Sequence, residues 1–382
     1  MKVLHVISSL DPRFGGPSTV LPIMANALVA EGLQVDVLCA DAPAAHASAD
    51  ACCLQPGGWR LWRVGGWGSR WRLSLPVLRW LWRRVHEYDV VHVHGLLGWV
   101  PMLAMKFSCL RSRPWVVRPM GTLGGFSLKQ GRVGLKRLWL RWIDLPLLRR
   151  ASAIHCTSRM EQREVEALGL ERAVRIALGL PKAAWPEPAE QAERAAGAAA
   201  PKVLYLSRLD AKKGIETLLE AWSVVGPSKP AAQLWIAGGG PAEYVADLQG
   251  KSSSLGLEDS VCWLGAVHGS DRLRLWSEAS AFVLPSYHEN FGVALLEAMQ
   301  QGLPCVSTLE VALATEPECR DALIRVKAGD AGELAAALRL LLDDPELASQ
   351  LGRRAAAAAA HFCPSTMAGE LHRLYCSISA QS

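Results

Sequence analysis

Two glutamates with a glycine between them offer the clearest chemistry in this sequence. Seven residues separate Glu289 from Glu297, and Phe291-Gly292 lies between them. An apolar strand is expected to stop at Pro285 and a helix to run from Gly292 to Gln301, so free backbone N–H groups open that helix. Such groups and the helix dipole favour a phosphate. The spacing therefore predicts carboxylates beside an anion site, although an isolated glutamate pair is more often solvated.

The string around these glutamates is longer than chance would supply. From Pro285 to Pro304 it reads Pro-Ser-x-x-Glu-x-Phe-Gly-x-x-x-x-Glu-Ala-Met-x-x-Gly-x-Pro. It resembles the E-x7-E segment of the retaining GT-B glycosyltransferases of family 4, glycosyl transferases group 1, of the bacterial polysaccharide type. The resemblance implies an α/β fold with two Rossmann-like domains facing each other across an interdomain cleft. It also implies transfer of a sugar from a nucleoside diphosphate sugar with retained configuration.

Two cations, Arg208 and Lys213, lie in a loop after a predicted strand. A planar guanidinium and a compact ammonium could clamp a diphosphate there, whereas a lone pair of this kind is usually solvated. The loop resembles the family segment G-R-x-x-x-x-K-G, with Ser207 in place of the first glycine. Following the family, both cations would stabilise the leaving diphosphate, Glu289 would orient sugar hydroxyls and Glu297 would bind the ribose. The predicted catalytic residues are Glu289, Arg208 and Lys213.

Glycine loops complete the donor site that the resemblance implies. A glycine loop follows the first predicted strand, but without G-x-G-x-x-G it carries no dinucleotide fingerprint. Another ends a strand at Gly238–Pro241, where backbone can approach a ligand, and Gly265–Val267 could support the nucleotide base. The predicted donor-binding residues are Gly16, Gly239, Val267, Asn290, Phe291, Gly292, Val293 and Glu297.

The acceptor side is expected to involve Gly15, His94 and Arg118. Alternation places His92 and His94 on one face of a strand, and the resemblance implies that the second histidine faces the cleft. A metal at this His-x-His pair is disfavoured, because the sequence offers no carboxylate or third histidine nearby. The sequence also contains no D-x-D, which agrees with a transferase that needs no metal or other cofactor.

Two positions depart from the family pattern. Met120 stands where many relatives have a histidine near the reacting sugar, and a thioether cannot transfer a proton. The segment from Ser307 to Arg320 contains no glycine, whereas relatives usually have a glycine-rich turn there that helps to hold the donor. These departures leave open a catalytically degenerate protein that binds another transferase. A nucleotide-sugar epimerase is a further alternative, which the E-x7-E string disfavours.

The elements that must position these residues form a repeated strand–helix pattern. With 382 residues, 50% of them hydrophobic and 20% charged, the chain can build two cores. Strands are predicted at 3–7, 34–39, 89–95, 115–122, 153–158, 203–206, 234–237, 261–265 and 281–284, and helices at 17–31, 161–168, 215–225 and 292–301. The expected parts are an N-terminal domain at 1–180, a linker at 181–201, a nucleotide-sugar-binding domain at 202–362 and a helix at 363–382 that could return to the first domain.

Tryptophan and arginine alternate from Trp59 to Arg84, and a second basic stretch runs from Lys129 to Arg150. Indoles and guanidinium groups suit a membrane interface, which would match a glycan or lipid-linked acceptor. A solvated face is the main alternative. Nucleic acid is not expected as a partner, because these positions match no known binding module.

The compartment is predicted from thiols and apolar runs. Ten cysteines occur without a C-x-x-C pair, which favours reduced thiols over a disulfide framework or zinc site. No apolar run is long enough for a signal peptide or a membrane span. The protein is expected in the cytoplasm, or peripherally on the cytoplasmic face of a membrane.

Overall fold

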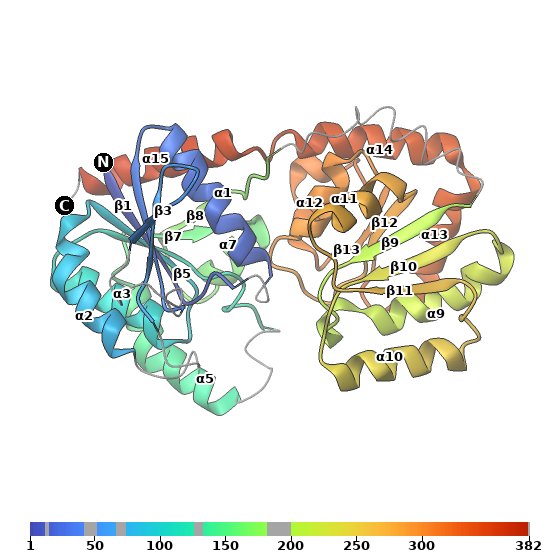
Figure 1. Ribbon diagram of the computed structural model, residues 1–382, viewed down its shortest axis with the longest axis horizontal. Helices are drawn as coiled ribbons and strands as arrows, with labels where there is room; N and C mark the ends of the chain where they lie inside the picture. Colours follow the sequence, from blue (N-terminus) through green and yellow to red (C-terminus); the bar gives the residue numbers. More distant parts are fainter. Residues whose placement is uncertain (12–14, 42–51, 66–73, 126–132, 182–199, 381–382) are drawn as a thin grey trace. The chain divides into compact units, whose positions relative to one another are not determined.

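The computed structural model describes residues 1–11, 15–41, 52–65, 74–125, 133–181 and 200–380. The chain folds into two compact units (Figure 1). Unit 1 comprises Met1–Pro181 and Phe362–Ser382, and unit 2 comprises Lys182–His361. Most of the expected linker at 181–201 lies outside the described residues.

Unit 1 is built on an eight-stranded sheet with the order β3-β4-β2-β1-β5-β6-β7-β8. All neighbouring strands are parallel except β3 and β4. β5 is buried along its whole length, as expected for a parallel strand covered on both faces. The strands are β1 Lys2–Ile7, β2 Gln34–Cys39, β3 Cys52–Leu54, β4 Arg60–Arg63, β5 Val90–His94, β6 Trp115–Arg118, β7 Ala153–Cys156 and β8 Ala173–Arg175.

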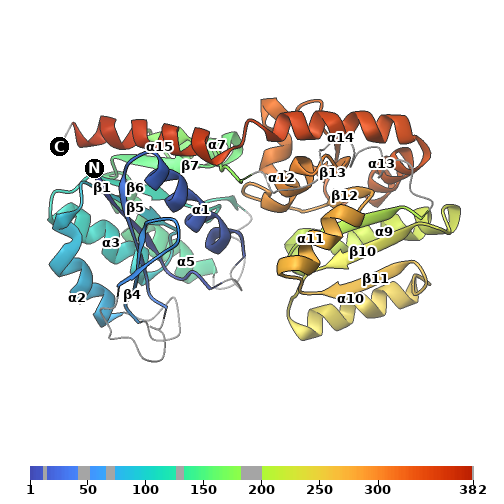
Figure 2. The ribbon, with the colours of Figure 1, turned by 45° about the horizontal axis from the view of Figure 1, so that its top comes forward.

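Helices cover both faces of this sheet, and the last helix of the chain, α15, packs against the first, α1 (Figures 1 and 2). A five-residue π-helical turn, Leu140–Asp144, joins α5 to α6. The helices are α1 Gly16–Ala30, α2 Leu75–Arg84, α3 Trp99–Leu110, α5 Val133–Trp139, α6 Leu145–Leu148, α7 Arg159–Glu166 and α15 Pro364–Ser379, with a 3-10 turn at Val85–Glu87.

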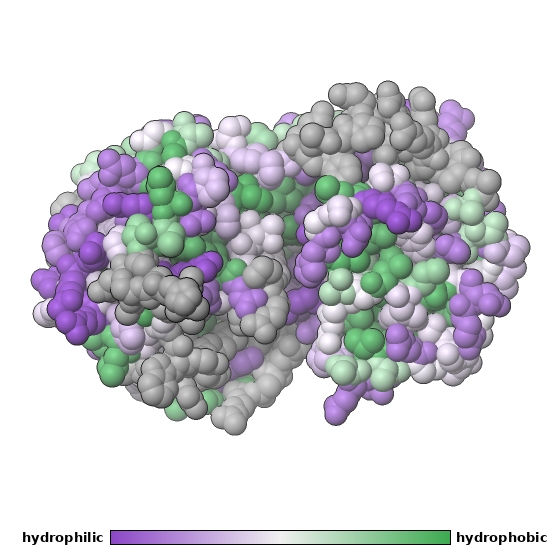
Figure 3. Space-filling view, in the orientation of Figure 1, coloured by the Kyte–Doolittle hydropathy of each residue, from purple (hydrophilic) through white to green (hydrophobic). Residues whose placement is uncertain are grey.

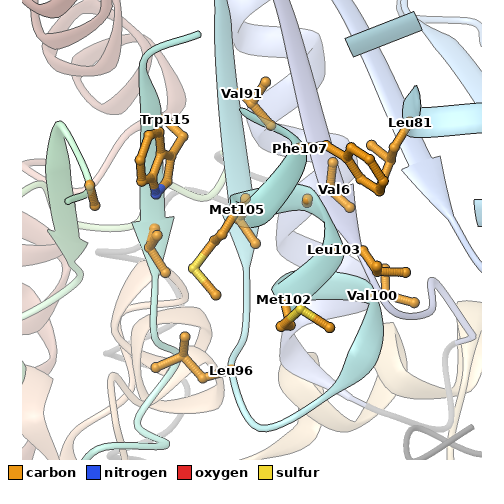
Figure 4. Close-up of a cluster of buried hydrophobic side chains, with 14 of the residues drawn as sticks. Val6, Leu81, Val91, Leu96, Val100, Met102, Leu103, Met105, Phe107 and Trp115 are labelled. Carbon is orange, nitrogen blue, oxygen red and sulfur yellow. The ribbon is translucent and has the colours of Figure 1, made fainter. Parts of the chain in front are cut away.

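One hydrophobic cluster joins the sheet of unit 1 to α2, α3, α5, α6 and α7 (Figure 4). Val91 and Val93 of β5 point into this cluster. Because side chains alternate along a strand, His92 and His94 point to the opposite face. That second face is covered by α15, whose Tyr375 hydroxyl lies 2.7 Å from Nδ1 of His92.

Unit 2 is built on a six-stranded parallel sheet with the order β11-β10-β9-β12-β13-β14. α9 packs beside α10 and α13, and α12 packs beside α14. The strands are β9 Lys202–Leu206, β10 Gln233–Ala237, β11 Val261–Gly265, β12 Ala281–Leu284, β13 Cys305–Thr308 and β14 Ile324–Val326. The helices are α9 Ile215–Val225, α10 Ala242–Ser254, α11 Gly269–Glu278, α12 Val293–Gln300, α13 Ala331–Asp343 and α14 Pro345–Ala359. Four 3-10 turns cover Ala211–Lys213, Gly226–Ser228, Ala312–Thr315 and Pro317–Cys319.

The α/β class and the two Rossmann-like units predicted from the sequence are confirmed. Every predicted strand is present, and the helix at 215–225 has the predicted bounds. Five strands of three or four residues, β3, β4, β8, β13 and β14, were not predicted. Strands this short carry too few alternating residues to give a pattern.

Candidate functional site

The cationic loop of unit 2 follows β9 and is fixed by its own backbone. The Asp210 side chain accepts a hydrogen bond of 3.1 Å from the Lys212 backbone N–H, which caps the 3-10 turn that carries Lys213. Gly214 then begins α9 with a φ of 68°. A Cβ at Gly214 would lie 2.1 Å from the carbonyl oxygen of Pro285, so only glycine fits between the loop and the end of β12.

Lys213 and Glu289, predicted from two separate motifs, form an ion pair. The Lys213 side chain is buried, and the Glu289 side chain remains partly exposed. Burial lowers the pKa of Lys213 to about 7, and the neighbouring cations Lys212 and Arg208 act in the same direction. Arg208 itself is exposed. The loop thus presents a buried amine and an exposed guanidinium, with Glu289 as the carboxylate partner of the amine.

Backbone hydrogen bonds hold the segment of Glu289 in place. The Glu289 N–H donates to the carbonyl of Glu310 at 2.9 Å, and the Ala312 N–H donates to the carbonyl of Glu289 at 3.1 Å. A third bond of 2.9 Å runs from the Leu313 N–H to the carbonyl of Phe291. The glycine-free segment after β13 therefore supports the Glu289 loop through its main chain.

Gly292 shapes the start of α12. Its φ of 101° is in the left-handed region, and a Cβ there would lie 2.8 Å from Cγ1 of Val311. The helix begins at Val293, and the first N–H groups of an α-helix have no partner within the helix. The first of these donors, at Val293, stands four residues after Glu289 and follows Asn290, Phe291 and Gly292 in the chain. The anion site at this helix start stays a prediction.

Glu297 has a partner that the sequence analysis missed. Its carboxylate, about one turn into α12, forms an ion pair with Arg272 of α11. Burial raises the pKa of Glu297, and Arg272 opposes that shift. Twenty-five residues separate the two partners, so no spacing rule links them.

The glycines after β10 pack against the loop that carries Arg208. The Leu209 N–H donates to the carbonyl of Gly239 at 2.9 Å. A Cβ at Gly238 would lie 1.8 Å from the carbonyl oxygen of Ser207, whereas one at Gly239 would meet only Ala266 at 3.5 Å. Val267 is half-buried after β11. Gly239 is therefore required less for packing than Gly238, and it remains open to a ligand role.

Gly15 lies between β1 and α1, and His94 and Arg118 are the last residues of β5 and β6. Open α/β sheets bind ligands at these carboxyl ends. Gly15 has a φ of 80° and precedes α1, whose first residue is Gly16. Arg118 is 3% exposed and His94 is 1% exposed. Burial lowers the pKa of Arg118 to about 10. Met120, at the family's histidine position, has a left-handed φ of 57°.

The expectation that no third histidine lies near His92 and His94 is wrong. Nδ1 of His5 lies 2.9 Å from Nε2 of His94, and Nδ1 of His155 lies 3.3 Å from Nε2 of His92. The strand order β1-β5-β6-β7 explains this, because it aligns histidines from distant parts of the chain. Among the described residues, His5, His92 and His94 form the one group whose ligand atoms could hold a metal. The positive charge of Arg118 beside them opposes a cation there.

Family models match both halves of the chain, and curated proteins resemble it in sequence. The family model glycosyl transferase 4-like domain matches residues 15–179, and the model glycosyl transferases group 1 matches residues 187–358. A GDP-mannose:cellobiosyl-diphosphopolyprenol alpha-mannosyltransferase of Xanthomonas campestris is 29% identical over 83% of this chain and 81% of its own length. A glycogen synthase of Mycobacterium tuberculosis is 32% identical over 70% of this chain and 63% of its own length.

Solved structures share the fold. The sucrose-phosphate synthase of Thermosynechococcus elongatus superposes with a TM-score of 0.79 over all of both chains at 22% identity. An Anabaena protein solved in complex with UDP and glucose superposes with a TM-score of 0.77, at 21% identity over 99% of this chain and all of its own. At these identities the likeness establishes the two-domain architecture.

Proposed function

Since the chain belongs to the retaining GT-B glycosyltransferases of family 4, the glycosyl transferases group 1, and uses a nucleotide sugar as donor, we propose that its acceptor is a lipid-linked glycan or a polysaccharide precursor. The reaction breaks the bond between the anomeric carbon and the diphosphate and forms one to an acceptor hydroxyl, with retained configuration. The proposed place of action is the cytoplasmic face of a membrane, without a metal.

The ion pair of Lys213 with Glu289 carries the donor-binding part of this proposal. Lys213 follows β9, and Glu289 follows β12, four residues before the first amide donor of α12. A donor diphosphate would compete with Glu289 for the buried amine. Glu289 would then be released to accept hydrogen bonds from the sugar hydroxyls. When the diphosphate replaces Glu289 as the partner of Lys213, the protein would therefore bind both the diphosphate and the sugar of the donor.

Stabilising the leaving group is the main requirement of the reaction, because negative charge grows on the diphosphate as the sugar takes on positive charge. Arg208, Lys213 and the first N–H groups of α12 are proposed to meet that charge. Glu297 is proposed to accept hydrogen bonds from the ribose, and its ion pair with Arg272 favours the ionised carboxylate.

The acceptor proposal rests on the relatives and on the sheet of unit 1. The Xanthomonas relative is named for a diphosphopolyprenol-linked acceptor. We assign the acceptor side of the present protein to Gly15, His94 and Arg118, at the carboxyl ends of β1, β5 and β6. An acceptor held in a bilayer would bring the protein to the membrane surface, where residues 59–84 are a proposed contact.

The test is release of nucleoside diphosphate from a panel of nucleotide sugars, with cell membranes as acceptor. Wild-type protein is expected to release nucleoside diphosphate from one nucleotide sugar of the panel. The rate for Glu289→Gln is expected to be lower by a factor of roughly one hundred or more, because the substitution removes the charge that orients the sugar. Glu278→Gln is the matched control, since Glu278 forms a partly buried ion pair of 2.6 Å with Lys202 in the same unit. Undiminished turnover by Glu289→Gln would rule out the assigned role.

A further inference from the structure

The structure changes which tryptophans of residues 59–84 could meet a membrane. Trp59, Trp62 and Trp80 are buried in unit 1. Trp82 is 53% exposed, and the guanidinium of Arg111 lies 4.5 Å from the centre of its ring. Trp67 and Trp71 lie outside the described residues. Of the described tryptophans in this stretch, Trp82 alone faces solvent.

A stronger apolar exposure lies on α5 and the π-helical turn after it. Leu135, Leu138 and Trp142 are 45%, 57% and 68% exposed. Their spacing of three and four residues places side chains along one side of a helix. Large apolar residues gathered in this way on a surface mark an interaction site.

At the π-helical turn, Trp142 faces solvent while the carboxylate of Asp144 points into the interior. Asp144 is fully buried, where it accepts hydrogen bonds from the Leu97 N–H at 2.9 Å and from Nε1 of Trp139 at 3.2 Å. Trp139 also packs edge-on against Trp99 of α3, with 5.1 Å between the ring centres. The inner side of the segment is therefore anchored, and the exposure of Trp142 does not come from an unfolded end.

Basic residues predominate in α5 and in the neighbouring helices of the same cluster. α2, α3 and α5 cover one face of the sheet, and Trp82 packs against Phe107 with 5.9 Å between the ring centres. Figure 3 shows hydrophilic side chains over the α2 side of this unit. Within α2, α3, α5, the π-helical turn and α6, all described, the one acidic residue is the buried Asp144. The cations of the same elements are Arg79, Arg83, Arg84, Lys106, Lys136, Arg137 and Arg141.

We propose that the outer surface of α2, α3 and α5, here called the basic layer, docks on an anionic phospholipid bilayer. Leu138 and Trp142 enter the headgroup region, and Arg137 and Arg141 beside them meet lipid phosphates. The proposal rests on the proposed lipid-linked acceptor for its biological purpose, but its physical content is independent of catalysis.

The charge of the basic layer and its exposed apolar residues together favour an anionic bilayer as its partner. The chain as a whole carries 41 lysines and arginines against 36 acidic residues, so a layer without an exposed carboxylate departs from the rest of the surface. A nucleic acid would use the cations but leave the exposed leucines unpaired. No helix in the described part of the chain has the length and hydropathy to cross a bilayer. Docking from one side is the mode that this surface supports.

The test is co-sedimentation of the full-length protein with phosphatidylcholine vesicles, with and without phosphatidylglycerol. Wild type is expected to sediment only with the anionic vesicles, and added salt is expected to weaken binding. Arg141→Gln should lower the partition coefficient roughly fivefold, the equivalent of about 1 kcal/mol for one cation. Leu138→Ser combined with Trp142→Ser should lower it further.

Matched controls come from unit 2. Leu340→Ser replaces a leucine that is 46% exposed on α13, and Arg354→Gln replaces an exposed arginine on α14. Both should bind vesicles like wild type. Equal binding by the α5 variants and wild type would overturn the proposal, as would a wild type that ignores anionic vesicles. A dimer in light scattering that the α5 variants abolish would instead assign the layer to a second copy.

Vesicle binding and catalysis are read separately. Release of nucleoside diphosphate by hydrolysis, measured without membranes, should be unchanged in the α5 variants. Loss of vesicle binding with intact hydrolysis supports the basic layer. If wild type did not hydrolyse any nucleotide sugar, the proposed function would be contradicted. The vesicle-binding result would still test the basic layer independently.

Discussion

Donor recognition is expected to depend most on Lys213, whose side-chain amine is buried. Its pKa of about 7 means that a substantial fraction of the free protein carries an uncharged amine above neutral pH. A bound diphosphate favours the charged ammonium and raises that pKa. Binding of the nucleoside diphosphate released in the donor panel should therefore take up a proton above pH 7, and little or none well below it.

Calorimetry in two buffers of different ionisation enthalpy measures this uptake. Lys213→Arg should abolish it, because a guanidinium stays protonated throughout. Lys212→Arg is the control in the same loop and should retain most of the uptake. The assignment fails if Lys213→Arg takes up as many protons as wild type.

At the residue scale, the sequence predicted the groups that lie in long motifs. Glu289 and Lys213 come from separate strings and form an ion pair. Arg272 was missed because its partner Glu297 lies on another helix, and nothing in the helix 269–278 distinguishes it from a solvated arginine. His5 was missed for a similar reason, since its approach to His94 depends on strand order.

At the element scale, glycines decide how closely the loops approach one another. Gly214→Ala should displace the cationic loop, because the added Cβ would lie 2.1 Å from the Pro285 carbonyl oxygen and φ is positive. We expect a loss of about 1–3 kcal/mol in unfolding free energy and a large rise in donor KM. Urea denaturation and initial rates measure the two effects.

Gly256→Ala serves as the control for that substitution. Gly256 also has a positive φ, of 67°, but a Cβ there meets nothing within 4 Å. It should lose stability through backbone strain alone and leave the donor KM unchanged. A similar KM for both variants would show that contact with Pro285 does not position the loop.

Elements with strong periodicity were predicted well, and irregular ones were not. The strand at 281–284 and the helix at 215–225 have the predicted bounds. The π-helical turn was not foreseen, because it arises from the burial of Asp144 against Leu97 and Trp139. The glycine-free segment 307–320 was read as a departure, yet its backbone supports Glu289. Main-chain hydrogen bonds leave little trace in residue types.

At the scale of the whole molecule, α15 is expected to be essential for unit 1. Leu371 and Tyr375 are fully buried, and Met367 is 1% exposed. Each such side chain contributes about 1.5–3 kcal/mol, so removing three approaches the entire stability of a typical domain. A chain that ends at His361 should lose the calorimetric transition of unit 1 and keep that of unit 2.

The control is Cys376→Ser, which changes an exposed residue of the same helix and should leave both transitions in place. Two unchanged transitions in the shortened chain would mean that α15 contributes little. Loss of both would mean that the units do not unfold independently.

The path of the chain through the two units also sets the order in which their segments are synthesised. Phe362–Ser382 belongs to unit 1, but the ribosome makes it only after all of Lys182–His361. Unit 2 can complete its sheet while unit 1 still waits for the helix that supplies Tyr375. Until then the histidine-bearing face of the nascent first unit, with His5, His92 and His94, has no cover from α15. A nascent chain that has not yet reached Phe362 therefore holds a complete sequence for unit 2 and an incomplete one for unit 1, so unit 1 is expected to finish folding after unit 2.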